Sequence, residues 1–258
     1  MVTRFILIIS LLIIAASVSA QKGNVPGNSA GTITNSNNAM EFVPVPGGCF
    51  SMGSSAGGRD EMPVHDVCVS GFYMAKYEVT QGQWRSIMGN NPSRFNRCGD
   101  DCPVEQVSWH DAQDFIQRLN SITGREHRLP TEAEWEYACR SGGIGDQEYC
   151  GSVDVDVTSW HEGNSGRRSH PVGKKAPNSL GIFDMSGNVW EWVQDWKGSY
   201  PSARQIDPVG AEASSTRVRR GGSWLYGPGQ SRAAWRSSGY PGDIAPDIGF
   251  RLAVSGSN

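Results

Sequence analysis

A helical spacing of apolar residues begins at Ser108 and continues for about three turns. The apolar positions fall at i, i+3, i+4 and i+7: Ala112, Phe115, Ile116 and Leu119. Ser108 and Asp111 form a capping box, in which each side chain can accept a hydrogen bond from a backbone N–H at the start of the helix. The pattern therefore predicts an amphipathic helix that begins here and buries one face.

Two further capping boxes predict two more helices. Thr80 with Gln83 opens one, and Thr131 with Glu134 opens the other. One side of each expected helix is apolar: Trp84, Ile87 and Met88 in the first, and Trp135, Ala138 and Cys139 in the second. Two to three helices are therefore expected, all within the first half of the chain.

From Ser141 onward the helix signals end, and short apolar stretches alternate with Gly, Asn, Asp and Pro. The chain holds 32 glycines and 14 prolines, which favour turns over long helices. A strand-like segment at 41–45 opens the expected folded part. The pattern predicts an α+β fold of mixed short strands and extensive ordered loops, which disulfides, tryptophan packing or a bound ion could hold in place.

Residues 1–20 have the pattern of a secretory signal peptide. Arg4 is the lone positive charge, the apolar run 5–16 is too short to span a bilayer, and small residues precede Gln21. An uncleaved membrane anchor is the alternative reading, but the polar segment that follows carries no stop-transfer signal. Because residue 21 is Gln and not Cys, a lipid-anchored lipoprotein is not expected. The sequence predicts a secreted or periplasmic protein.

Residues 21–39 are rich in Gly, Asn, Ser and Thr and are expected to form a disordered polar spacer, followed by a single folded domain over 40–258. Loss of residues 1–20 removes one of the 23 basic residues and none of the 26 acidic ones, so the net charge is near −4. That charge gives no electrostatic reason to bind nucleic acid or, once the signal is cleaved, an anionic membrane.

The cysteines are even in number and would be exported to an oxidising compartment: Cys49, Cys68, Cys98, Cys102, Cys139 and Cys150. Disulfides are the default expectation, and neighbours in sequence suggest Cys49–Cys68, Cys98–Cys102 and Cys139–Cys150, although six cysteines allow 15 pairings. A zinc site at Cys98 and Cys102 is the rival interpretation. It lacks a His or second Cys pair at matching distance.

A series of short motifs extends from about Met40 to Val254: FVPVPGG at 42–48, FSMG at 50–53, EMPVH at 61–65, YEVT at 77–80, PVEQVSW at 103–109, RLPTEAEWE at 128–136, NS at 164–165, HPVG at 170–173, GNVWEW at 187–192, RRGGSW at 219–224, RAAWR at 232–236 and GFRL at 249–252. In number and order they resemble the formylglycine-generating enzyme family, also called sulfatase-modifying factors. The resemblance implies a variant of the C-type-lectin fold.

Members of that family oxidise a sulfatase cysteine with copper bound by two active-site cysteines, act as other oxidases or sulfoxide synthases, or bind ligands through a variable C-terminal loop. No cysteine lies beyond Cys150, and Tyr226 stands about where the resemblance places the first copper thiol. Copper is therefore an unlikely cofactor here, because Cu(I) needs thiolate ligands. We expect no formylglycine-generating activity and assign no catalytic residue.

The resemblance also implies a structural calcium ion bound by Asp184, Gly187, Val189 and Glu191, with carboxylate oxygens from the first and last and backbone carbonyls from the other two. Calcium prefers six to eight oxygen ligands, and glycine lets a backbone carbonyl turn inward. The alternative is that the two carboxylates only cap turns beneath the tryptophans. A second calcium site is not expected, because the loop 164–168 is too short.

Six residues near the C-terminal loop are candidates for ligand binding: Trp224, Tyr226, Ser231, Arg232, Arg236 and Arg251. Trp224 is expected to be partly exposed, whereas tryptophans of this kind are more often core than a sugar-stacking platform. The arginines could bind an anionic ligand, but buried ion pairs to Asp243 or Asp247 would explain them equally well.

The expected function is therefore binding of an unknown protein, peptide or glycan ligand by the loop from Trp224 to Ile248, displayed on a rigid scaffold. The alternative is a non-thiol oxidoreductase that acts on a peptide or metabolite in a biosynthetic or protein-maturation pathway. A metal site of two His and one carboxylate would need His161 and His170 to converge. The sequence leaves the ligand open.

Overall fold

The computed structural model describes residues 32–33 and 40–256. The expected signal peptide at 1–20 and most of the expected spacer at 21–39 lie outside the described residues, so these boundaries stay predictions. Within the spacer, Thr32–Ile33 forms β1, which pairs antiparallel with the start of β2 (Met40–Val45).

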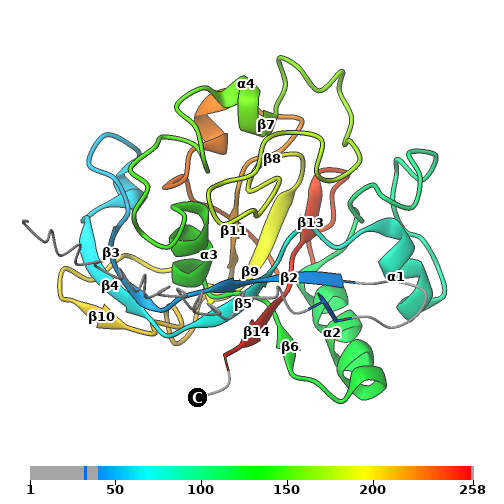
Figure 1. Cartoon of the computed structure of the whole chain (residues 1–258), viewed down its shortest axis with the longest axis horizontal. Coiled ribbons are helices and arrows are strands. Elements are labelled where there is room, and N and C mark those ends of the chain that lie inside the picture. Colours follow the sequence, from blue (N-terminus) through cyan, green and yellow to red (C-terminus); the bar gives the residue numbers. More distant parts are fainter. Residues whose placement is uncertain (1–31, 34–39, 257–258) are drawn as a thin grey trace, which may run out of the picture.

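Short strands form two larger sheets on which the molecule is built (Figure 1). The five-stranded sheet has the order β1, β2, β5 (Phe72–Ala75), β14 (Ala253–Ser255) and β6 (His127–Arg128). The four-stranded sheet has the order β12 (Ser237–Gly239), β11 (Arg217–Arg220), β9 (Trp190–Trp196) and β13 (Ile248–Phe250). The C-terminal strand thus closes against the N-terminal part of the domain.

Two smaller sheets complete the β structure. One joins β10 (Gln205–Ile206), β4 (His65–Val69) and β3 (Gly48–Met52), and the other pairs β7 (Ser159–Trp160) with β8 (Ser186–Gly187). Single 3-10 turns occur at η1 (Arg59–Glu61) and η2 (Pro228–Ser231). This mixture of short strands, few helices and long ordered connections confirms the predicted α+β, C-type-lectin-like fold.

The three predicted helices are confirmed as α1 (Gln81–Met88), α2 (Trp109–Thr123) and α3 (Glu132–Cys139). Each begins with the predicted reciprocal capping box. The expectation that no helix follows Ser141 is wrong by one turn, α4 (Val155–Thr158), which the Asp154 side chain caps by accepting a hydrogen bond from Asp156 N. A single turn carries too little periodicity to be recognised in the sequence.

The buried side chains form two clusters, one around α3 and one around α2. Trp135 of α3 is fully buried among strands β3, β4, β5 and β9. In the other cluster Phe115 of α2 stacks on Trp84 of α1, with ring centroids 5.4 Å apart. Figure 1 shows α1 and α2 together on one side of the molecule and α3 on the other, with β9 between them.

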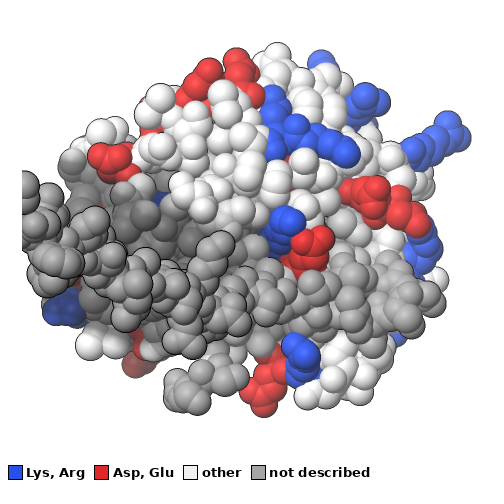
Figure 2. Space-filling view, in the orientation of Figure 1, with Lys and Arg blue, Asp and Glu red and all other residues white. Residues whose placement is uncertain are grey.

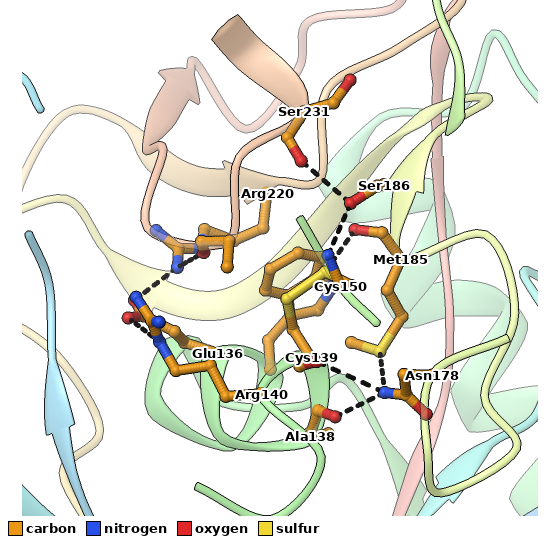
Figure 3. Close-up of a disulfide and its surroundings, with 12 residues drawn as sticks. Glu136, Ala138, Cys139, Arg140, Cys150, Asn178, Met185, Ser186, Arg220 and Ser231 are labelled. Atoms are coloured by element: carbon orange, nitrogen blue, oxygen red, sulfur yellow. Dashed lines mark hydrogen bonds and ion pairs between the residues drawn. A yellow bond between two sulfur atoms is a disulfide. The ribbon is translucent and has the colours of Figure 1, made fainter. Parts of the chain in front are cut away.

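The cysteines pair as sequence proximity suggests, in Cys49–Cys68, Cys98–Cys102 and Cys139–Cys150. No free cysteine remains among the described residues. Cys98 and Cys102 therefore have no thiolate that could bind zinc. Figure 3 shows the third disulfide, which joins the end of α3 to the loop between α3 and α4. Disulfides thus hold the loop-rich regions, as expected for a fold with few long helices.

Candidate functional site

The C-terminal segment 221–248 leaves the four-stranded sheet at the end of β11, returns to it briefly as β12, and ends where β13 begins. Gly221 and Gly222 start it with φ values of 94° and 79°, a backbone region that favours glycine. A Cβ on Gly222 would lie 2.8 Å from Gln230 O, so the chain passes too close to itself for any side chain there. The two glycines fix the turn that begins the predicted binding loop.

Buried arginines hold the inner side of this segment. Arg220 donates to Glu136 Oε2 at 2.6 Å and to the carbonyls of Ala233 and Ala234 at 2.8 and 3.2 Å. Figure 3 shows Arg220 reaching towards Glu136 on α3. Because the guanidinium satisfies the carbonyls of residues 233–234, which lie in neither a helix nor a strand, it fixes the path of these residues over α3.

Arg236 and Arg232 extend the same arrangement. Arg236 contacts Glu132 with two hydrogen bonds of 2.6 and 2.7 Å, and Arg232 contacts Glu61 with bonds of 2.6 and 3.1 Å. Although burial acts to raise it, the pKa of Glu132 lies below its ordinary value, because the guanidiniums of Arg236 and Arg220 favour its charged form. The arginines thus serve as internal ion-pair partners.

Arg251 is fully buried and donates to both oxygens of Glu191, at 2.6 and 2.7 Å. The expected partners Asp243 and Asp247 are wrong: the arginines pair with glutamates from distant elements. Arg236 and Arg251 are therefore not available for ligand binding. Releasing either arginine would leave a buried carboxylate without its partner.

Two more predicted ligand residues are also buried. Trp224 is 5% exposed, donates from Nε1 to Pro246 O at 3.1 Å, and packs edge-on against Phe95 with centroids 5.4 Å apart. The expectation of a partly exposed Trp224 is therefore wrong, whereas the core interpretation of the tryptophans holds for Trp190, Trp192 and Trp224. Ser231 is also buried, and its backbone carbonyl accepts from Ser186 Oγ at 2.9 Å (Figure 3).

Outwards the same segment presents large apolar side chains: Leu225 (39% exposed), Tyr226 (39%), Tyr240 (62%) and Ile244 (57%). Arg219 donates to Ser238 O at 2.6 Å, two residues before Tyr240, and pairs with β9, on which Trp190 packs against Tyr226 with centroids 5.8 Å apart. We call these four residues the apolar face. Of the residues chosen from sequence, Tyr226 lies in it.

Two of the predicted calcium ligands, Asp184 and Glu191, belong to a group of three buried carboxylates that also contains Glu78. Glu78, Asp184 and Glu191 are each at most 2% exposed and share the single guanidinium of Arg251. Burial first, and then Asp184 and Glu191, place the pKa of Glu78 well above its ordinary value, and burial raises that of Asp184 to about 6. Asp184 Oδ1 is buried without a hydrogen-bond partner. The three carboxylates outnumber the guanidinium of Arg251, so either protons, as the raised pKa values indicate, or a bound cation must balance the excess negative charge.

The fit to calcium is partial. Asp184 offers one unengaged oxygen, while both oxygens of Glu191 accept hydrogen bonds from Arg251, and Oε2 also accepts from Trp135 Nε1. Across residues 32–33 and 40–256, no three His, Cys, Asp or Glu side chains are arranged to bind a metal by themselves. Gly187, in β8, and Val189, after it, follow Asp184 in the chain. Their backbone carbonyls would have to complete the calcium ligands.

Sequence reasoning missed two buried glutamates. Glu78 accepts from Val189 N at 3.1 Å and from Asn188 Nδ2 at 2.6 Å, so it fixes the backbone of the predicted calcium turn. Glu105 is fully buried with Oε2 unpartnered, and burial raises its pKa to about 7. Both lie within motifs of the sequence, YEVT and PVEQVSW, but their partners are too distant in sequence to identify.

The two histidines considered for a metal site serve other contacts. His161 bonds through Nε2 to Asp156 Oδ1 at 2.9 Å, and its Nδ1 accepts from Gly163 N at 3.2 Å. His170 stacks on Trp160, with centroids 3.8 Å apart, and bonds through Nε2 to Ser165 O at 2.6 Å. Each ring is held by local partners.

Comparison with known proteins agrees with the fold. Residues 29–255 match the model of the sulfatase-modifying factor enzyme 1-like domain. The chain is 30% identical to the chaperone protein LppX of Paenibacillus barcinonensis, covering 95% of this chain and 97% of that protein. It is 28% identical to the formylglycine-generating enzyme of Bos taurus, covering 93% of this chain and 81% of the enzyme.

Two solved structures resemble it along most of its length. Treponema denticola variable protein 1 superposes with a TM-score of 0.82 at 28% identity, covering 88% of this chain and 99% of its own. PvdO from Pseudomonas aeruginosa superposes with a TM-score of 0.74 at 27% identity, covering 88% and 98%.

Proposed function

Because the chain belongs to the sulfatase-modifying factor enzyme 1-like family, we propose that it is a binding module of that family, which contacts a protein or peptide partner through the apolar face. The observation that carries the proposal is the two-sided character of segment 224–248. Its inner side is anchored by buried polar groups, while Leu225, Tyr226, Tyr240 and Ile244 are exposed. Tyrosines and aliphatic side chains on an ordered segment suit a partner surface, because little conformational entropy is lost on binding.

Two relatives support a binding role for a chain of this family. One is named a chaperone, and the chain covers 97% of its length. The other is named a variable protein, and its fold superposes along 88% of this chain. A carbohydrate ligand remains the other partner class considered. The buried Trp190, Trp192 and Trp224 give it less support, because the exposed aromatic residues of the segment are tyrosines.

Oxidation of a sulfatase cysteine is not part of the proposal. Copper(I) chemistry of that kind requires thiolates, and the described cysteines are all held in disulfides. Tyr226 stands at the position expected for the first thiol and packs against Trp190, with centroids 5.8 Å apart. A phenol at this place does not replace a soft sulfur ligand.

The proposal is tested by partner capture with the immobilised mature protein and with a Tyr226→Ser/Tyr240→Ser variant. The matched control is Ile122→Ser/Val153→Ser, which removes two exposed apolar side chains elsewhere (57% and 76% exposed). We expect one or more proteins to be retained by the wild type and the control and lost by the tyrosine variant. Retention by all three, or selective binding on a glycan array that survives the tyrosine changes, would contradict it.

We also propose export to an oxidising compartment, since three disulfides persist only where thiols are not kept reduced. No helix among the described residues is long and apolar enough to cross a membrane. N-terminal sequencing of the protein recovered outside the cytoplasm should begin at Gln21. A chain recovered only from the cytoplasm, with cysteines that react with maleimide, would refute export.

Calcium at Asp184, Gly187, Val189 and Glu191 is the cofactor we propose, with the unpartnered Asp184 Oδ1 as its support. The ion would supply positive charge to a region where carboxylates exceed cations, so its removal should lower the melting temperature. Native mass spectrometry should show one bound ion, lost in Asp184→Ala. An EDTA-treated protein with no bound ion and an unchanged melting temperature would exclude the site.

A non-thiol oxidoreductase remains the second candidate, favoured by the acid–base groups behind Trp224. Ser223 Oγ donates to Asp247 Oδ2 at 2.8 Å, and burial raises the pKa of Asp247 as well as that of Glu105. With a pKa raised to about 7, Glu105 can exchange a proton near neutral pH. Oxygen uptake with a panel of thiol and aromatic peptides, lost in Glu105→Gln, would support this function. We expect no uptake with any peptide.

A further inference from the structure

A basic groove of about 500 Å³ lies beside Trp224, near the start of the C-terminal segment. Its walls are residues 94–98 on one side and 168–171 on the other. Arg94, Arg97 and Arg168 are exposed, and none of them forms an ion pair within the described part of the chain. Three guanidiniums around one groove present donors without an internal acceptor.

The two walls are held in place before any ligand arrives. The Cys98–Cys102 disulfide closes one wall, and Cys98 Sγ lies 3.8 Å from Ser169 O of the other. Phe95 N donates to Glu105 Oε1 at 2.7 Å, and the carbonyl of Phe95 accepts from Gln81 Nε2 at 3.4 Å. Because the backbone is fixed, only the arginine side chains would lose freedom on binding.

The groove adjoins the apolar face. Phe95 of one wall packs on Trp224, and Ser165, close to the other wall, donates from Oγ to Trp224 O at 2.9 Å. Leu225 and Tyr226 follow directly in the chain and are exposed. A basic, anion-binding groove thus continues into an apolar surface, although the mature protein carries a net negative charge. On the part of the face in Figure 2 that the described residues form, acidic and basic side chains are intermixed.

We infer that the basic groove binds an acidic peptide segment, whose carboxylates pair with Arg97 and Arg168 while adjoining apolar side chains contact Leu225 and Tyr226. This deepens the proposed function and rests on it, since it names the chemistry of the partner at that face. Guanidinium forks match planar carboxylates with two hydrogen bonds each. Ser169, in the groove wall, is buried, and its Oγ has no hydrogen-bond partner among the described residues.

The test is a fluorescence-anisotropy titration of the mature protein with a labelled peptide of glutamates followed by leucines, at low ionic strength. The groove variant is Arg97→Gln/Arg168→Gln. The matched control is Arg118→Gln/Arg125→Gln, which removes the same charge from exposed positions on α2 and the loop after it. We expect the groove variant to bind at least about tenfold more weakly and the control to stay within about twofold. The dependence on salt should also weaken in the groove variant.

Four results would overturn the inference. These are no binding by the wild type, equal weakening in both variants, displacement of the peptide by far lower concentrations of a sulfated oligosaccharide, and inorganic phosphate binding as tightly as the peptide. The third would identify a glycan ligand and the fourth a simple anion site. Failure here is distinguishable from failure of the binding role, because partner capture that depends on Tyr226 and Tyr240 would persist without any binding of the acidic peptide.

Discussion

Arginines serve opposite purposes in two regions of this molecule. In the interior of the fold Arg220, Arg236 and Arg251 are at most 6% exposed, and each contacts a glutamate. In the basic groove Arg94, Arg97 and Arg168 are exposed and have no such partner among the described residues. Charge at the first place is balanced within the fold, and charge at the second is left for something outside it.

The difference follows from desolvation. A buried guanidinium loses its water and must find carboxylates and carbonyls, as Arg220 does with Glu136, Ala233 and Ala234. Once satisfied, it cannot serve a ligand without leaving its partner uncompensated. An exposed arginine keeps its hydration and its freedom to pair with an incoming anion. Counting arginines in a motif therefore says little about ligand binding until their burial is known.

The largest expected change in stability comes from removing one of the buried arginines. Arg251→Met should destabilise the protein by about 3–5 kcal/mol, because Glu191 would remain buried without its guanidinium. Arg168→Met, at an exposed position, should change stability by no more than about 0.5 kcal/mol. Urea unfolding of both variants measures the difference. Equal losses would show that burial does not separate the two sets.

A second prediction concerns Asp195, a buried carboxyl group that forms no ion pair with any other described residue. Burial, and then Glu132, raise the pKa of Asp195 to about 8, while the arginine-paired Glu132 has a lowered pKa. A raised carboxyl pKa contributes stability below its unfolded value, near 3.8, and that stability is lost as the pH rises through about 8.

Asp195→Asn should remove this loss and still accept the hydrogen bond from Glu132 N. Between pH 5 and 8 the wild type should therefore lose on the order of 2–4 kcal/mol more stability than the variant. Melting temperature measured against pH for both proteins checks it. Parallel curves would mean that Asp195 is ionised in the native protein throughout this range.

The smallest expected effect sharpens the exposed side. Tyr226→Ser/Tyr240→Ser should shift the free energy of unfolding by no more than about 1 kcal/mol, because both side chains are exposed. The same variant should lose partner binding. A large loss of stability would place the tyrosines in the scaffold and remove the apolar face from the account.

The helices could be predicted from sequence because their signals are local. The capping boxes at Thr80, Ser108 and Thr131 each lie within four residues, and the disulfides join cysteines separated by 4 to 19 residues. The family motifs give the fold by their order. The capping boxes and disulfides are short-range signals. The motifs are recognised because a whole family repeats their order.

The site was predictable only in part, because its contacts are long-range. Arg236 meets Glu132 across 104 residues, and the walls of the basic groove meet across 71. Trp224 is buried by contacts with Phe95 and Pro246, and nothing in the order of the residues indicates that these two surround it. Exposed positions such as Tyr240 and Ile244 follow from that packing rather than from any local pattern.

The most direct test of the account is photo-crosslinking from single positions in the mature protein. A photoreactive amino acid would replace Tyr240 or Ile244 in the apolar face, and Ile122 or Ile144 at exposed apolar positions elsewhere. The account predicts one specific protein adduct from the first pair and none from the second. Adducts from Ile122 or Ile144 alone, or equal adducts from all four positions, would contradict a binding role for the C-terminal segment.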